Sequence, residues 1–438
     1  MSVFIGYPSF MAYQMMKGKK GNNDGFPSIP GMIARYSALG LTNEEMSKNP
    51  VWVDKTGNGH DLQMKNFAWK EGSGISDIYP GALVFDGVDD YGVCENFPIL
   101  TKEKGYTVVA LRQWIEEKNS ITALVSNSKN WNQDGAFVFE YNNLENNYPN
   151  LEISFGSNTE LGREKSSFTY QTSKLYNGKE IKFGEFLGSD RLTVAKSNEN
   201  LSPNSNVAIW EIVILDHDAT EEELTKIKDY FVKTYPWLFP DQAWTVVGKT
   251  NEDEDRATIA NITGNGNDLV LSNFGFAEGS GYNEQGEYAG YLVTDGVDDK
   301  VQSSSFTMNE DWTIVGDGEL LSNVQINCGI VKAQNVYLYN TANGLLISIN
   351  NPRGLQSFGT KSLHAICSDG RLYDRNWVEY EYTVDQNFKI VESSLNIGFN
   401  LNNYTQIAFK NLGIYNNQIL SKDDCIKAYN YLQTLKAK

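Results

Sequence analysis

Two identical pentapeptides are the residues of this sequence with the clearest chemical potential. Asp86 to Asp90 and Asp295 to Asp299 both read DGVDD. Carboxylates grouped so closely could bind Ca²⁺, which takes several oxygen ligands, although the spacing is not that of an EF-hand loop. An Asp-Gly pair also supplies the positive φ of a turn between two antiparallel strands, in which the later aspartates accept backbone N–H groups. We therefore expect a structural turn and no cofactor, with Asp86, Asp89 and Asp90 as the alternative calcium ligands.

The sequence contains none of the residue patterns that Ser-His-Asp, histidine–metal or glycosidase catalysis requires. The three histidines, His60, His217 and His364, stand far apart and without a matching Asp and Ser context, so neither a Ser-His-Asp triad nor a histidine-rich metal centre is indicated. Glycoside hydrolysis needs two carboxylates that flank the sugar bond. The runs LEISFGS, from Leu151, and WEIVILDHD, from Trp210, each offer one glutamate without an alternating partner. We predict no catalytic residue, and a polysaccharide-cleaving enzyme is a remote alternative.

An internal repeat defines the elements that must position these side chains. TGNGHDLQMKNFAWKEGSG, from Thr56, returns as TGNGNDLVLSNFGFAEGSG from Thr263, and LVFDGVDDYGV from Leu83 returns as LVTDGVDDKVQ from Leu292. A repeat of this length indicates two copies of one domain. Neither TGNG is followed by the Lys-Ser or Lys-Thr of a phosphate-binding loop, so we expect a turn with an asparagine in the left-handed conformation.

Each copy ends in an apolar alternating run followed by a helix. Thr220 with Glu223, and Ser421 with Asp424, have the three-residue spacing of an N-cap hydroxyl and its acidic partner. Upstream, short segments of period two are separated by Gly, Asn and Asp clusters, which is typical of strands and turns. The predicted fold class is all-β: two tandem β-sandwiches, each ending in a short amphipathic helix.

The predicted domain plan has three parts. Residues 31–238 and 239–438 are the two sandwich domains, which meet in YPWLFPDQAW, where two prolines end the first terminal helix. Residues 1–30 are an arm with no counterpart before the second copy. The arm is too apolar for a solvated tail, so we predict that it docks on a partner as an anchor. Its apolar residues are Phe4, Ile5, Tyr7, Phe10, Met11 and Tyr13.

Two tryptophans of the first copy are candidates for sugar binding. Trp69 and Trp131 lie near glycine-rich turns and could present a flat aromatic face to a sugar ring. Phe276 occupies the place of Trp69 in the second copy, which suits core packing as well as stacking on a ligand. Both interpretations stay open at this point.

Composition narrows the range of partners. Aromatic residues make up 12% of the chain and glycine occurs 38 times, a mixture that favours strands and tight turns. The formal charge of −18 would repel a phosphate backbone, so no nucleic-acid partner is expected. No signal-peptide pattern and no run of ~20 apolar residues is present, so we expect synthesis in a cytoplasm without membrane insertion. The four cysteines lack paired spacing and are predicted to be reduced core thiols.

Several runs resemble known modules. ALVFDGVDDYGV and its repeat YLVTDGVDDKVQ, the start WVDKTGNGHDL and the ending KTYP resemble concanavalin A-like lectin or laminin-G-like jelly rolls, over nearly all of both copies. The run GKTNEDEDRATIANITGNGNDLVLSNFGFAEGSGY resembles a segment of structural proteins of tailed bacteriophages, crAss-like phages among them. The chain departs from the family in two places. Lys300 replaces an aromatic after the second DGVDD, which argues against carbohydrate or metal binding there, and the E-x-D-x-x-E run of the related glucanases is missing.

What this resemblance implies is a curved sandwich used for adhesion and displayed on a virion. With the apolar arm, it predicts a non-enzymatic virion protein, a head fibre or capsid-decorating protein assembled in the host bacterial cytoplasm. Capsid or other virion proteins are the expected partners of the arm, and the chain could form a homo-oligomer. The alternative is a receptor-binding protein of tail or capsid that binds a host-surface glycan.

Overall fold

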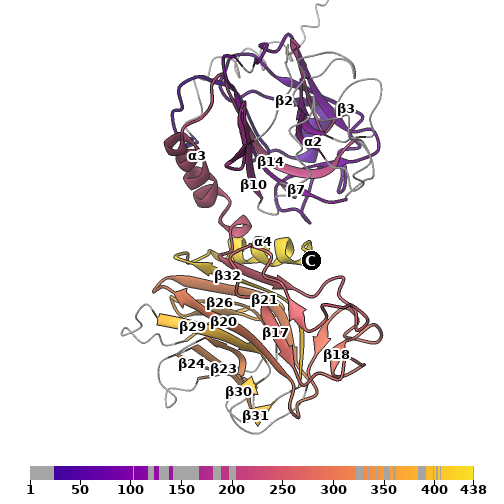
Figure 1. The fold of residues 1–438 in the computed structure, drawn as a ribbon, viewed down its shortest axis with the longest axis vertical. Helices are drawn as coiled ribbons and strands as arrows, with labels where there is room; N and C mark the ends of the chain where they lie inside the picture. Colours follow the sequence, from indigo (N-terminus) through magenta and orange to yellow (C-terminus); the bar gives the residue numbers. More distant parts are fainter. Residues whose placement is uncertain are drawn as a thin grey trace, which may run out of the picture. The chain divides into compact units, whose positions relative to one another are not determined.

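The fold is taken from a computed structural model (Figure 1), in which the chain divides into two compact units, residues 1–234 and 235–438. Trp131, Cys328 and the six apolar arm residues named above lie outside the described residues. The structure describes residues 24–101, 103–116, 123–127, 138–141, 167–180, 189–196, 204–321, 329–333, 336–341, 344–349, 356–358, 362–382, 391–397, 399–400, 403–404 and 406–437.

The boundary between the units lies before Tyr235, ahead of the predicted boundary after Leu238. A 3₁₀ turn, η2 (Pro236–Leu238), follows the first terminal helix. Trp237 of this turn accepts a hydrogen bond at its carbonyl oxygen from the Tyr415 hydroxyl at 2.9 Å, and Lys427 lies 4.2 Å from the centre of its ring. The turn therefore packs with the second unit, because the carbonyl oxygen and the ring of Trp237 both have partners there.

Unit 1 is built on two antiparallel sheets. In the larger sheet the strand order is β12-β11-β10-β7-β14-β5-β4, and β1 also pairs with β14; in the smaller sheet it is β2-β3-β6-β13-β8-β9. The strands of the larger sheet are β1 (Met32–Ser37), β4 (Gly74–Ile75), β5 (Leu83–Asp86), β7 (Thr107–Trp114), β10 (Phe168–Thr172), β11 (Leu175–Tyr176), β12 (Lys179–Glu180) and β14 (Asn206–Leu215). Those of the smaller sheet are β2 (Val51–Trp52), β3 (Leu62–Lys65), β6 (Tyr91–Glu95), β8 (Ala123–Ser126), β9 (Val138–Tyr141) and β13 (Arg191–Val194).

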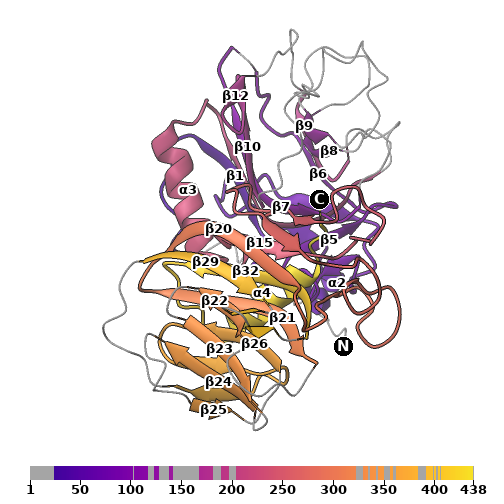
Figure 2. The same cartoon turned by 60° about the horizontal axis from the view of Figure 1, so that its bottom comes forward.

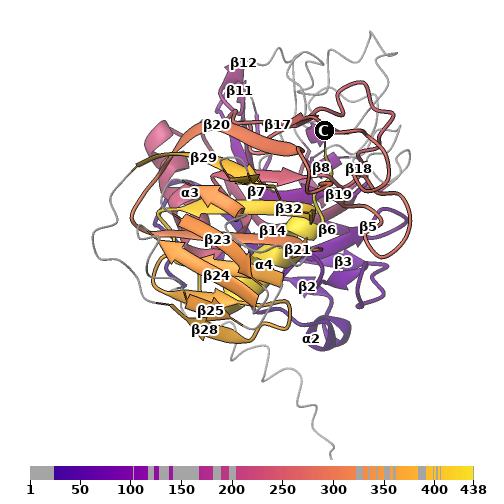
Figure 3. The ribbon, with the colours of Figure 1, turned by 90° about the horizontal axis from the view of Figure 1, so that it is seen from below.

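Unit 2 repeats the larger sheet strand for strand, in the order β18-β19-β32-β21-β26-β27-β28 with β15 paired to β32. These strands are β15 (Gln242–Thr245), β18 (Gly281–Tyr282), β19 (Leu292–Val293), β21 (Trp312–Leu320), β26 (Ser362–Cys367), β27 (Arg371–Tyr373), β28 (Glu379–Glu381) and β32 (Ile407–Asn416). The opposing side holds two further sheets, β16-β17-β20-β29 and β22-β23-β24-β25, and the small pair β30-β31 (Figures 2 and 3). Their bounds are β16 (Thr258–Ile259), β17 (Leu269–Ser272), β20 (Lys300–Met308), β22 (Gly329–Ala333), β23 (Val336–Thr341), β24 (Gly344–Ile349), β25 (Gln356–Phe358), β29 (Val391–Ile397), β30 (Phe399–Asn400) and β31 (Asn403–Tyr404).

A continuous apolar core joins the two sheets of unit 1. Phe85 and Ile209 of the larger sheet and Leu62 and Leu192 of the smaller sheet are fully buried in one cluster. Unit 2 has a core of the same kind. The predicted all-β sandwich fold is therefore confirmed for both copies. The described cysteines, Cys94, Cys367 and Cys425, are buried thiols without a disulfide.

The predicted terminal helices are present as α3 (Glu221–Thr234) and α4 (Lys422–Gln433). Thr220 Oγ1 accepts the N–H of Glu223 at 3.3 Å, and Ser421 Oγ accepts the N–H of Asp424 at 3.2 Å. Both predicted N-caps therefore form. The buried side of α4 packs on β21 and β32, where it closes the sheet face that the sandwich core leaves open. A third, short helix, α2 (Asn43–Lys48), lies in unit 1. No described helix has the length and apolar character needed to span a bilayer.

The DGVDD segment is a corner between sheets, and the prediction of a hairpin was wrong. β5 ends at Asp86 in the larger sheet, whereas β6 begins at Tyr91 in the smaller sheet. Gly87 has the predicted positive φ, 73°, and Gly296 has 75° in unit 2. The sequence showed the turn but not the partners of the strands on either side, because pairing depends on residues far along the chain.

The TGNG turns follow the prediction in unit 2 and differ from it in unit 1. Asn267, directly after the second TGNG, has the predicted left-handed conformation with a φ of 64°. In unit 1 the left-handed residues are the glycines, with φ of 78° and 89° at Gly57 and Gly59, and not the asparagine between them. Asn58 instead donates its side-chain amide to the carbonyl oxygen of Ile33 in β1 at 2.8 Å. The asparagine fastens the turn to a strand, a long-range contact that the local sequence does not reveal.

Candidate functional site

In the acidic corner of unit 1, the carboxylates of Asp86 and Asp90 accept hydrogen bonds from backbone N–H groups. Asp86 Oδ1 accepts the N–H groups of Val88, Asp89 and Asp90 at 2.7, 3.2 and 3.3 Å. Asp90 Oδ2 accepts the N–H of Asp86 at 3.1 Å. The three aspartates offer oxygens within 4.8 Å of one another, and burial raises the pKa of Asp90 to about 6. These hydrogen bonds fit a structural corner, and calcium binding by Asp86, Asp89 and Asp90 stays an untested alternative.

The corner of unit 2 has the same construction. Asp299 Oδ2 accepts the N–H of Asp295 at 2.7 Å, and Asp295 Oδ1 accepts the N–H of Val297 at 2.7 Å. Ser280 donates its hydroxyl to Asp299 Oδ1 at 3.1 Å, and burial raises the pKa of Asp299 to about 6. A corner that both copies build in the same way belongs to the shared fold.

Trp69 lies at a turn that the two copies share. Its ring stacks on Phe67 at 4.7 Å, and Phe67 meets the core residue Phe85 edge-on at 5.1 Å. Trp69 and its counterpart Phe276 both have positive φ, 53° and 48°. The half-buried indole thus extends the core, and its use as a sugar platform stays a prediction.

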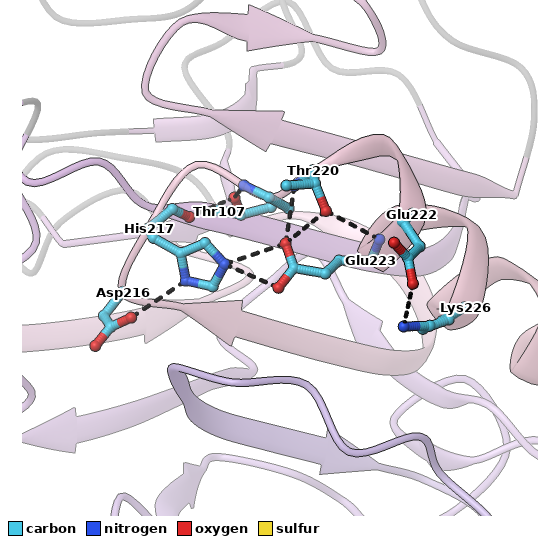
Figure 4. Close-up of polar contacts among 8 residues, drawn as sticks. Thr107, Asp216, His217, Thr220, Glu222, Glu223 and Lys226 are labelled. Carbon is cyan, nitrogen blue, oxygen red and sulfur yellow. Dashed lines mark hydrogen bonds and ion pairs between the residues drawn. The ribbon is translucent and has the colours of Figure 1, made fainter.

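His217 lies between β14 and α3, flanked by two carboxylates (Figure 4). Its Nδ1 is 3.2 Å from Asp216 Oδ1, and its Nε2 is 3.2 Å from both carboxylate oxygens of Glu223. Burial alone would lower the pKa of His217, but hydrogen bonds to Glu223 and Asp216 outweigh burial and raise it. Glu223 also accepts the hydroxyl of the helix cap Thr220 at 2.9 Å. The imidazole thus links the end of the last strand to the first turn of α3.

Unit 2 builds the same junction without a titrating side chain. In unit 1, Thr107 Oγ1 donates to the carbonyl oxygen of His217 at 2.7 Å. In unit 2, Thr313 Oγ1 donates to the carbonyl oxygen of Gln418 at 3.0 Å. Gln418 therefore holds the backbone place of His217. The junction itself belongs to the fold, and the histidine is particular to unit 1.

A group of half-buried aromatic and polar side chains surrounds Asp317 on β21 of unit 2. Asp317 Oδ2 accepts the Tyr291 hydroxyl at 3.0 Å, the Gln433 amide at 3.1 Å and the Tyr429 hydroxyl at 3.2 Å. Three segments thereby meet at one carboxylate: β21, the β18–β19 loop and α4. We call this group, with the two rings described next, the Asp317 cluster: Tyr291, Asp317, His364, Trp377, Tyr429 and Gln433.

The rings of the Asp317 cluster are packed against one another. His364 stacks on Tyr429 with ring centres 4.2 Å apart, and Trp377 meets Tyr429 edge-on at 5.7 Å. Burial lowers the pKa of His364, and its Nδ1 has no hydrogen-bond partner among the described residues. Trp377 lies in the turn between β27 and β28 with a φ of +58°, a strained conformation for a bulky residue. The cluster combines flat apolar faces with a carboxylate that has several polar neighbours.

Sequence reasoning did not find the Asp317 cluster. Its members are scattered from Tyr291 to Gln433. Strand pairing makes the equivalence visible, because Asp317 lies opposite Asn411 as Leu111 lies opposite Glu211. A change from a buried leucine to an aspartate at an equivalent strand position is the signal that would have found the cluster.

No family model and no curated protein matches this sequence. Solved structures with some similarity include a Trypanosoma rangeli sialidase in complex with sialic acid, with a TM-score of 0.32 and 11% identity over 59% of this chain and 47% of the sialidase. The chain thus spans about half the length of that sialidase. The binding domain of botulinum neurotoxin serotype D/C VPI 5993 has a TM-score of 0.31 and 10% identity, over 89% of this chain and 99% of that domain. Likeness at this level carries no inference about activity or ligand.

Proposed function

We propose that this chain is a non-catalytic structural protein of a bacteriophage virion, a head fibre or capsid-decorating protein that displays two β-sandwich units. One observation carries the proposal: the motifs that both copies repeat serve the fold. The DGVDD carboxylates accept backbone N–H groups, and the hydroxyls of Thr220 and Ser421 cap helices. A duplication of scaffold residues suits a display protein, in which repeated units extend a particle surface.

The arm is the proposed attachment to capsid or other virion proteins. Its apolar residues between Phe4 and Tyr13 were predicted to dock on a partner. The last part of the arm is described, and it packs on unit 1. Asp24 Oδ2 pairs with Arg35 Nη1 at 2.7 Å, and the Phe26 ring lies 4.0 Å from the Arg35 guanidinium. Residues 1–23 can therefore be removed while the contacts that fasten the arm to unit 1 remain.

Deletion of residues 1–23 from the full chain tests this proposal. We expect the shortened protein to keep both units folded and to lose its association with particles purified from infected cells. The matched control is Asp24→Asn in the full-length chain, which perturbs the fastening contact and leaves the apolar arm in place. Normal incorporation of the deleted protein into particles would contradict the attachment role.

The second candidate function is glycan binding, as a receptor-binding protein of tail or capsid. The observation that favours it is the Asp317 cluster, which gathers aromatic faces and a carboxylate at half-buried positions in unit 2. Binding of the full-length protein to an array of host polysaccharides tests it. Reducing sugar released from those polysaccharides would instead favour the remote enzymatic alternative.

A further inference from the structure

The Asp317 cluster occupies a part of the sandwich that unit 1 fills with buried apolar residues. Leu111, the strand equivalent of Asp317, is fully buried, and so is Trp210, the strand equivalent of Lys410. In unit 2, Lys410 Nζ instead lies 5.6 Å from the centre of the half-buried Tyr291 ring. The sandwich therefore does not require polar groups here. Unit 2 has half-buried tyrosines and charged side chains where unit 1 has fully buried apolar side chains.

The β27–β28 hairpin presents the tryptophan of this region. In unit 1 the equivalent hairpin, β11–β12, turns through Asn177 and Gly178 alone. In unit 2 the turn is longer, and Asp374 Oδ1 holds it by accepting the N–H groups of Asn376 and Val378 at 2.8 and 2.9 Å. The turn fixes Trp377 in its left-handed conformation beside Tyr429. Strain of this kind, held by surrounding hydrogen bonds, is common at binding sites.

The polar groups of the region are acceptor-rich. Asp317 Oδ2 already has three donors, whereas no hydrogen bond joins Oδ1 to the described residues. Glu319, two residues further along β21, is 3.7 Å from Arg375 of the β27–β28 turn. Free carboxylate oxygens accept hydroxyl groups and repel anions, so they select against acidic ligands.

We propose that the Asp317 cluster binds a neutral hexopyranose unit of a glycan. A pyranose ring offers an apolar C–H face, which suits the half-buried faces of Trp377 and Tyr429, and hydroxyl groups that suit the free oxygen of Asp317. The carboxylate of Asp317 disfavours sialylated and other anionic sugars. The proposal deepens the glycan-binding candidate and rests on it. It concerns residues other than the Lys300 corner, where the sequence argued against carbohydrate binding.

The experiment uses the full-length protein on an array of neutral and acidic bacterial polysaccharides, followed by affinity measurement on the best-bound neutral one. Trp377→Ala is expected to weaken binding at least tenfold, and Trp377→Phe to retain most of it because an aromatic face remains. Asp317→Asn is expected to weaken binding less than Trp377→Ala does. The matched control is His217→Gln, which gives unit 1 the residue found at the equivalent place in unit 2 and is expected to leave binding unchanged.

Two outcomes would overturn the site. One is silence of the folded wild-type protein toward every neutral glycan, and the other is equal affinity of Trp377→Ala and wild type. A preference for acidic glycans would also contradict the proposal. Hydrogen exchange of α4 and the β27–β28 turn shows whether Trp377→Ala keeps its fold. Because particle attachment is assigned to residues 1–23, Trp377→Ala should still join particles, so failure of the site and failure of the virion role are distinguishable.

Discussion

The two units have different residues at the same buried position, that of Glu211 on β14 and Asn411 on β32. In unit 1, Glu211 is fully buried and receives two hydrogen bonds of 3.1 Å from the guanidinium of Arg35 on β1. In unit 2 the equivalent residues are Ala243 and Asn411, and both polar atoms of the buried Asn411 side chain lack a partner among the described residues. The sandwich therefore accepts a charged pair or a neutral residue here, so the ion pair is not a requirement of the fold.

The surroundings of this strand position differ between the units, because the arm lies against it in unit 1. Arg35 also contacts Asp24 and Phe26 of the arm, as well as the Tyr230 hydroxyl of α3 at 3.0 Å. Unit 2 has no preceding arm of this kind, and alanine, Ala243, stands at the position of Arg35. The comparison suggests a rule for this molecule: repeated residues maintain the sandwich, and residues found in one copy alone serve a task of that copy. In unit 1 that task is to hold the arm, and in unit 2 it is the proposed glycan site.

The largest expected effect is the loss of the Arg35 charge. Arg35→Met removes the cation that faces the buried Glu211 carboxylate, which should destabilise unit 1 by about 3–5 kcal/mol. The double variant Arg35→Met, Glu211→Leu should recover most of this loss, because no buried charge remains. Hydrogen exchange followed by peptide mass spectrometry reports each unit separately. Unchanged protection of β1 and β14 in Arg35→Met would show that the pair is dispensable in unit 1 as well.

The acidic corners should respond alike in the two units. The pKa values of Asp90 and Asp299, about 6, exceed those of the unfolded chain, so each protonated carboxyl stabilises its fold below pH 4 and this contribution is lost as the pH rises through 6. The full shift corresponds to about 3 kcal/mol, and because solvent screens part of the interaction, the expected loss is about 1–2 kcal/mol per corner. Asp90→Asn and Asp299→Asn should each remove the pH dependence of their own unit over that range, as measured by denaturation at pH 4 to 7. A response in one unit only would break the equivalence of the corners.

Removal of either helix cap should have a similar, smaller effect. Thr220→Ala and Ser421→Ala each leave an N–H group in the first turn of α3 or α4 without its acceptor. We expect about 1 kcal/mol of destabilisation from each. Exchange rates in the first turn of each helix measure it. A much larger loss in one unit would mean that its helix has a further role.

The smallest expected effect is a pH dependence of stability that His217 gives to unit 1 and that unit 2 lacks at the equivalent position. The raised pKa of His217 means that the protonated imidazole stabilises unit 1 below pH 6.5, and that this contribution is lost as the pH rises through the folded pKa. Because the ring is partly exposed, the contribution should stay below about 1 kcal/mol. His217→Gln, which copies Gln418, should abolish this dependence in unit 1. Titration of the imidazole by NMR in the full chain checks the direction, and a pKa at or below the ordinary value would contradict it.

Local sequence patterns were sufficient to predict the secondary structure and the two-unit organisation of this protein. Period-two runs, the N-cap spacing at Thr220 and Ser421, and the repeat itself predicted strands, helices and two sandwich units, because these features depend on neighbours in sequence. The hairpin at DGVDD was predicted wrongly because β5 and β6 choose partners in different sheets.

The sites that distinguish the units were beyond local patterns. The role of Asp317 depends on the fold, which brings β21, α4 and the β18–β19 loop together around its carboxylate. The role of Arg35 depends on the pairing of β1 with β14. The sequence showed that Trp69 has an aromatic counterpart, but it could not show that Leu111 and Asp317 are equivalent. Strand register supplied that equivalence.

The most direct test of the account is an electron-microscopy map of an intact particle that carries this protein. We expect density for two β-sandwich units on the particle surface, with residues 1–23 in contact with another virion protein and the Asp317 cluster exposed to solvent. Absence of the chain from purified particles, or a chain held through unit 2 with residues 1–23 in solvent, would contradict it.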